Sequence, residues 1–182
     1  SSSINAGYQL DNVELYHFST YSNRDSILDF TFRRPRQTDR AIPEIYPMGF
    51  RPTELISETD FETATGIKGS TEQGFDWDLS VNYGENQADW ENTVGVNASL
   101  GALSPTSFYL GQFLADELTA QLDITKAYQL DSGGSLQVSF GTQFRREHFE
   151  INEGEPLSYA DGNNGNAAGA QGFPGFSPEA VN

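Results

Sequence analysis

The chain has 182 residues and a formal net charge of -16, because 26 Asp and Glu side chains outnumber 10 Lys and Arg side chains. This charge opposes binding to the phosphate backbone of nucleic acids, so we expect no nucleic-acid partner. The absence of cysteine excludes disulfides, thiolate metal sites and cysteine nucleophiles, and no run approaches the roughly 18 apolar residues that a membrane-spanning helix needs.

The first predicted hairpin covers about residues 2–24. Its first strand alternates apolar with polar residues, and an Asp11-Asn12 turn leads into the second strand. The register of residues 13–24 stays open at this point, because Leu15, Tyr16 and Phe18 cannot all point to one side of a strand.

A long loop is predicted over about residues 26–58. Four cationic side chains lie within eight positions of this loop: Arg33, Arg34, Arg36 and Arg40. Guanidinium groups suit carboxylates and phosphates, which makes these side chains candidates for contact with an anionic ligand. Two other readings remain open for them, namely pairing with nearby carboxylates or contact with lipopolysaccharide phosphates. Tyr46, between prolines of the same loop, is a further ligand candidate.

The second predicted hairpin covers about residues 59–84. Its period-two alternation is the clearest in the chain, since one face carries Phe75, Trp77, Leu79, Val81 and Tyr83. Such rings are expected in the interfacial girdle of a membrane barrel, although the core of a soluble sandwich would explain them too.

A second long loop is predicted over about residues 85–112, with Trp90 and Tyr109 as ligand candidates. The third hairpin covers about residues 113–151 and turns at Asp131 to Gly134. A Gly-rich tail over about residues 152–182 is predicted to be a third long loop.

The predicted fold class is therefore all-β, an antiparallel meander of about six strands that forms a sector of a transmembrane β-barrel. Short turns on one side and long loops on the other are typical of bacterial outer-membrane barrels. Connections of roughly thirty residues are unusual in a soluble sandwich.

Motifs of catalysis are lacking: the chain has no G-x-S-x-G, P-loop, H-E-x-x-H or G-x-G-x-x-G signature. The two histidines, His17 and His148, lie in separate strand regions, and a hydrated strand end explains the glutamates beside His148. We expect no enzymatic activity, no cofactor and no metal site.

Four segments of the chain resemble, in order, the barrel region of TonB-dependent receptors, in the iron-complex receptor group of Gram-negative bacteria. They are RRPRQTDRAIPEIYPMGFRP, GFDWDLSVNYGEN, NASLGALSPTSFYLGQ and FGTQFRREHFEINEGEPLSYADG. The resemblance implies a 22-stranded barrel with an N-terminal plug, located in the bacterial outer membrane. It also implies binding and import of a scarce nutrient such as a siderophore-iron complex, with energy supplied by TonB.

The plug, the TonB box and the remaining strands are not in this sequence, so we expect the chain to be an internal part of such a barrel. The expected partners are outer-membrane lipid and lipopolysaccharide, the remainder of the barrel and the plug, TonB through the plug region, and a small-molecule ligand. The alternatives are a passive porin-like or adhesin barrel and a secreted carbohydrate-binding β-sandwich.

Overall fold

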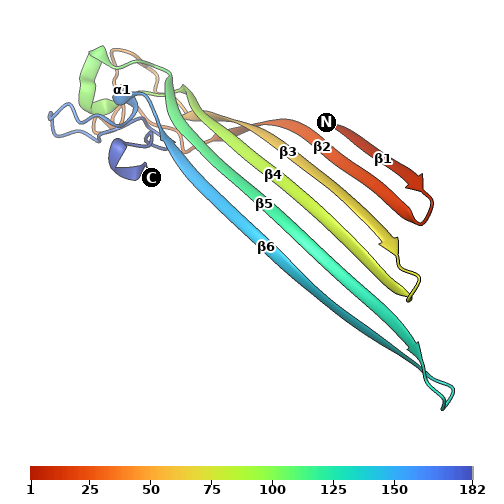
Figure 1. Cartoon of the computed structure of the whole chain (residues 1–182). Helices are drawn as coiled ribbons and strands as arrows, with labels where there is room; N and C mark the ends of the chain where they lie inside the picture. The colour runs from red at the N-terminus through yellow and green to blue at the C-terminus, as the bar shows by residue number, and fades with distance from the viewer. Residues whose placement is uncertain (182) are drawn as a thin grey trace. The chain divides into compact units, whose positions relative to one another are not determined.

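The computed structural model of the chain describes residues 1–181. They form one six-stranded sheet in which each strand pairs with the next in chain order, as Figure 1 shows. This confirms the predicted all-β antiparallel meander. The strands are β1 (Ser2–Leu10), β2 (Val13–Asp29), β3 (Thr53–Ser70), β4 (Phe75–Val94), β5 (Phe108–Gln129) and β6 (Ser135–Glu153). The short helices are η1 (Ala98–Leu103), α1 (Pro156–Tyr159) and η2 (Pro178–Ala180).

The strands extend further into the predicted long loops than the side-chain pattern indicated. β2 continues to Asp29 and β3 begins at Thr53, while β4 continues to Val94 and β5 begins at Phe108. The predicted loop limits 26–58 and 85–112 were therefore too wide, and Trp90 and Tyr109 lie in strands. Polar residues are frequent in the ends of β2, β3 and β4 and weaken the apolar alternation there, whereas the backbone can pair whatever the side chains are.

The chain divides into two compact units. Unit 1 comprises residues 1–22, 60–85 and 115–148, and unit 2 comprises residues 23–59, 86–114 and 149–182. All three tight turns belong to unit 1, and all three long connecting segments belong to unit 2.

The turns of unit 1 depend on residues that tolerate a left-handed backbone. Asp11, Gly74 and Gly133 have φ values of 48°, 75° and 86°. Asp and Gly are the residue types that adopt such angles at least cost, which explains why the predicted turn positions are correct.

The register of β1 and β2 settles which way the side chains of residues 13–24 point. Leu15 lies opposite Tyr8, whereas Tyr16 lies opposite Gly7, so Leu15 and Tyr16 occupy different faces of the sheet. The Tyr16 ring lies over Gly66, where any β-carbon would overlap it, and its hydroxyl donates to Asp78 at 2.7 Å. Tyr16 therefore belongs to the polar face.

The other face of unit 1 is uncovered and carries most of the unit's apolar side chains. Leu79 and Phe140 are 47% and 62% exposed, and neither is enclosed by a second sheet, because residues 1–181 form a single sheet. Further exposed apolar side chains of this face are Ile4, Tyr8, Leu10, Leu15, Tyr21, Phe61, Val81, Leu136, Val138 and Phe144. Among the described residues, every buried hydrophobic side chain belongs to unit 2.

Unit 2 has its own hydrophobic core in two clusters. The first joins Ala41, Ile42, Phe50 and Val96, and the second joins Phe108, Leu110 and Ala170. The long segments between strands are thus packed and not extended into solvent. No helix in the described part of the chain is long and apolar enough to cross a membrane.

Candidate functional site

Unit 2 contains a hollow of about 520 Å³, which we call the aromatic hollow. The lining residues that β2, β3 and β4 contribute are two positions apart on each strand, so their side chains point to the same face of the sheet. A volume of this size falls within the roughly 300–1,000 Å³ of small-molecule sites. The lining consists of Arg24, Ser26, Ile56, Glu58, Asn86, Ala88, Trp90, Phe113 and Phe149.

Three rings form the apolar side of the aromatic hollow. Trp90 meets Phe113 edge to face with 6.1 Å between ring centroids, and Phe113 stacks with Phe149 at 5.8 Å. Phe149 is largely exposed, and the ring nitrogen of Trp90 is buried without a hydrogen-bond partner. Rigid rings in a hollow supply contact area for a ligand at low cost in conformational entropy.

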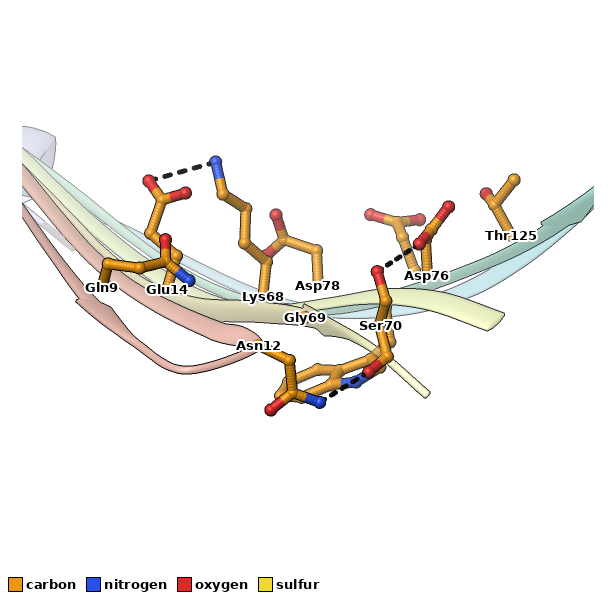
Figure 2. A pocket seen from close by; sticks show the side chains of 11 residues that line it. Gln9, Asn12, Glu14, Lys68, Gly69, Ser70, Asp76, Asp78 and Thr125 are labelled. Atoms are coloured by element: carbon orange, nitrogen blue, oxygen red, sulfur yellow. Dashed lines mark hydrogen bonds and ion pairs between the residues drawn. The ribbon is translucent and has the colours of Figure 1, made fainter. Parts of the chain in front are cut away.

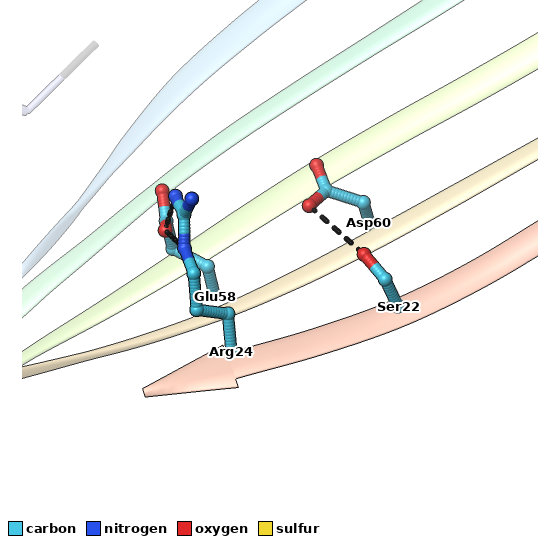
Figure 3. Close-up of polar contacts among 4 residues, drawn as sticks. All are labelled: Ser22, Arg24, Glu58 and Asp60. Atoms are coloured by element: carbon cyan, nitrogen blue, oxygen red, sulfur yellow. Dashed lines mark hydrogen bonds and ion pairs between the residues drawn. The ribbon is translucent and has the colours of Figure 1, made fainter. Parts of the chain in front are cut away.

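An ion pair forms the polar side of the hollow. The Arg24 Nε donates to Glu58 Oε2 at 2.8 Å, and Figure 3 shows the two side chains reaching across β2 and β3. Because the pair is exposed, its net stabilisation is about 0–1 kcal/mol. A polar ligand could therefore exchange hydrogen bonds with it at little cost. Figure 3 also shows the next pair along these strands, Ser22 and Asp60 of unit 1.

The four predicted arginines do not line the aromatic hollow. Arg33 is partly buried and donates from Nε to the Gln171 side chain at 3.2 Å, and its pKa is lowered by burial and then by the nearby charge of Arg40. Arg40 lies 3.5 Å from Asp39 in an exposed ion pair. Arg34 and Arg36 are exposed.

Of the predicted aromatic candidates, only Trp90 lies in the hollow. Tyr46 stacks on Phe50 with 4.7 Å between centroids and packs against the first core cluster. The Tyr109 hydroxyl donates to Asp89 at 2.9 Å, and burial followed by this hydrogen bond raises the pKa of Tyr109 to about 12. Asp89 and Trp90 are successive strand residues and point to opposite faces.

Four residues of the hollow were not predicted as ligand contacts from the sequence: Arg24, Glu58, Phe113 and Phe149. All four lie on strands, and for Arg24 and Glu58 the available signal was their spacing of two residues from Ser26 and Ile56. That signal was hidden because residues 26–58 were assigned to a loop, whereas Phe113 and Phe149 were assigned to strands and gave no local signal of a hollow.

A second hollow, of about 410 Å³, lies on the polar face of unit 1. Figure 2 shows Glu14, Lys68 and Asp78 pointing to the same side of the sheet. Lys68 Nζ lies 3.3 Å from Glu14 Oε1, and Ser70 donates to Asp76 at 2.5 Å. These charges and hydrogen-bonding groups mostly satisfy one another, as expected of a hydrated structural surface.

The described residues include no cluster of three or more His, Cys, Asp or Glu side chains placed to hold a metal ion. His148 instead pairs with Asp116, whose Oδ2 lies 2.9 Å from its Nδ1.

Comparison of the chain with protein-family models, with curated proteins and with solved structures found no match. The resemblance to TonB-dependent receptors therefore stays a prediction from the residues.

Proposed function

We propose that the chain is part of the wall of a bacterial outer-membrane receptor of the TonB-dependent type, which binds and imports a scarce nutrient such as a siderophore-iron complex. In this proposal unit 1 contains the membrane-crossing strand segments, and unit 2 contains the residues beyond the hydrocarbon layer. The chain itself makes and breaks no bond.

The observation that carries the proposal is the uncovered apolar face of unit 1. In soluble monomers, contiguous exposed apolar patches larger than a few hundred Å² mark interaction or membrane surfaces. Here exposed Leu, Val, Ile and Phe side chains recur at alternate positions on several neighbouring strands, while the opposite face carries ion pairs and carboxylates. Hydrocarbon on one side and water on the other would satisfy both faces.

The length of the strands also supports a membrane-crossing role for unit 1. β2 to β6 contain 17, 18, 20, 22 and 19 residues, whereas about 9–11 residues are enough to cross a bilayer. Each of these strands can therefore cross the hydrocarbon and still contribute to unit 2. Strands of this length are also uncommon in soluble domains, where about 5–6 residues is usual.

The two outer strands support a closed assembly. β1 and β6 are the edges of the sheet, and each leaves a row of backbone N–H and C=O groups without a strand partner. Such groups are costly in lipid unless a neighbouring strand satisfies them, and closure into a barrel provides that neighbour.

Ligand binding is assigned in this proposal to unit 2. The aromatic hollow offers three rings beside an exposed ion pair, and the loop with Arg33, Arg34, Arg36 and Arg40 offers cations for an anionic group. Together they suit a ligand with both apolar and charged parts.

A flotation experiment with phosphatidylcholine vesicles tests the membrane assignment. The full chain, diluted from urea into vesicles, is expected to float with the lipid and to resist extraction by carbonate. A chain that remains folded and monomeric in the aqueous fraction without detergent would contradict the proposal and favour a soluble carbohydrate-binding protein.

The reading frame around the chain distinguishes an active receptor from a passive barrel. We expect this frame to encode a plug domain and a TonB box. A frame that encodes only further barrel strands would favour a porin-like channel or an adhesin.

A further inference from the structure

Residues 170–176, which we call the strap, cross unit 2 outside the regular sheet. Five backbone hydrogen bonds hold them: Ala170 and Gly175 donate to Ser158, Gln171 donates to Val96, Phe176 donates to Leu110, and Phe176 accepts from Gly154. The donor to acceptor distances are 2.7, 3.3, 3.0, 2.8 and 3.0 Å respectively. The strap is thus fixed by single contacts and not by a continuous strand ladder.

Two buried side chains of the sheet complete its attachment. Asn92 Nδ2 donates to the Gln171 carbonyl at 3.0 Å, and the Phe173 N–H donates to Glu54 Oε1 at 2.6 Å. Both Glu54 and Asn92 are 0% exposed. Between these contacts Gly172 has φ 118°, and a β-carbon there would lie 2.5 Å from Glu54 Oε1, so the strap approaches the carboxylate through a glycine.

The strap places two phenyl rings on the rings of the aromatic hollow. Phe173 packs against Trp90 with 5.7 Å between centroids, and Phe176 packs against Phe113 at 4.7 Å. The strap therefore covers surface of the same two side chains that line the hollow. Displacing it would enlarge the aromatic surface open to a ligand.

The attachment through Glu54 is costly when the carboxylate is charged. Glu54 Oε2 is buried without a hydrogen-bond partner, and a buried charge without full compensation is strongly unfavourable. Burial accordingly raises the pKa of Glu54, while the hydrogen bond from the Phe173 N–H and the nearby Asn92 amide oppose this shift. When the strap is closed, the protonated, neutral form of Glu54 is favoured over the charged form.

Among the described residues, no charged side chain pairs with Glu54. β4 provides Asn92, and the strap provides backbone. The charged groups around this region have other partners: Arg33 contacts the Gln171 side chain, and Arg51 lies 3.8 Å from Asp29. The carboxyl group of Glu54 is therefore the group whose protonation changes the charge at this contact.

We propose that the strap is a displaceable cover over Trp90 and Phe113, attached to the sheet through Glu54 and Asn92 and released when Glu54 becomes negatively charged in contact with water. Closure is favoured in acid, where Glu54 is neutral, and opening is favoured as the pH rises. The strap and the residues that it covers all belong to unit 2, so its opening does not depend on whether unit 1 lies in a membrane.

Quenching of Trp90 fluorescence by acrylamide tests the cover. The full chain is used in detergent micelles with Trp77→Phe, which leaves Trp90 as the single tryptophan. Quenching is expected to increase from about pH 4 to about pH 8, a range that includes raised carboxyl pKa values. Glu54→Gln, a neutral isostere that keeps an acceptor for Phe173, is expected to lose this pH dependence, whereas the control Glu62→Gln on the same strand should retain it.

A second variant keeps the test decisive if Glu54→Gln does not fold. Phe173→Ala leaves Glu54 in place and removes the ring that covers Trp90, so quenching at low pH should rise to the level of the parent at high pH. Equal pH dependence in the parent and in Glu54→Gln, or unchanged quenching in Phe173→Ala, would overturn the inference.

Discussion

Replacement of Phe140 by Arg separates a membrane wall from a soluble sheet. Phe140 is 62% exposed and lies in the exposed apolar run of β6, between Val138 and Phe144. In water, substitution of such a surface residue changes the free energy of unfolding by about 0.5 kcal/mol or less. Facing the middle of a bilayer, the same Arg costs about 2–4 kcal/mol.

The expected loss in vesicles corresponds to a change in the folding equilibrium constant of roughly 30-fold to 900-fold, since each 1.36 kcal/mol is a factor of ten. Gln143→Arg is the matched control, because residue 143 occupies the opposite, polar face of the same strand. Its replacement should change the unfolding free energy by less than about 1 kcal/mol.

Equilibrium unfolding by urea, followed by intrinsic fluorescence of the chain in phosphatidylcholine vesicles, measures both variants. If Phe140 contacts hydrocarbon, Phe140→Arg should lose a large part of the unfolding free energy and the control only a small part. Equal losses, or no loss for Phe140→Arg, would show that this face does not contact hydrocarbon.

Three further predictions concern unit 2. Leu110→Ala should lower the free energy of unfolding by about 2–5 kcal/mol in urea titrations, because Leu110 is 0% exposed within a core cluster; a loss under about 1 kcal/mol would contradict this packing. Gly172→Ala should destabilise unit 2 by about 1–3 kcal/mol, since the φ of residue 172 is 118° and the added carbon would approach Glu54. Proteolysis of residues 152–182 should become faster, and an unchanged rate of cleavage would contradict this prediction. The pKa of Tyr109 is raised to about 12 by burial and by Asp89, so its stabilising effect is present below its ordinary value of 10.0 and is lost as the pH rises towards 12. In an alkaline absorbance titration, Tyr109→Phe should therefore reduce the late-titrating tyrosine signal by one residue, and an unchanged late signal would refute the assignment.

The number and order of the strands, and the three turns, could be predicted from the sequence. Side chains alternate with period two in a strand, so runs such as Phe75 to Tyr83 report which face is apolar. Asp11, Gly74 and Gly133 mark turns because few other residues accept a positive φ. These signals are local, and no distant contact is needed to read them.

The register of β2 and the contents of unit 2 were decided by contacts between residues far apart in the chain. Tyr16 joins the polar face because Gly66 leaves room for its ring and Asp78 accepts a hydrogen bond from its hydroxyl. Glu54 was assigned to a long loop, yet it is buried in β3 because the backbone of Phe173 provides a hydrogen bond. A buried carboxylate cannot be distinguished from a solvated one by local pattern, since its burial depends on which distant segment covers it.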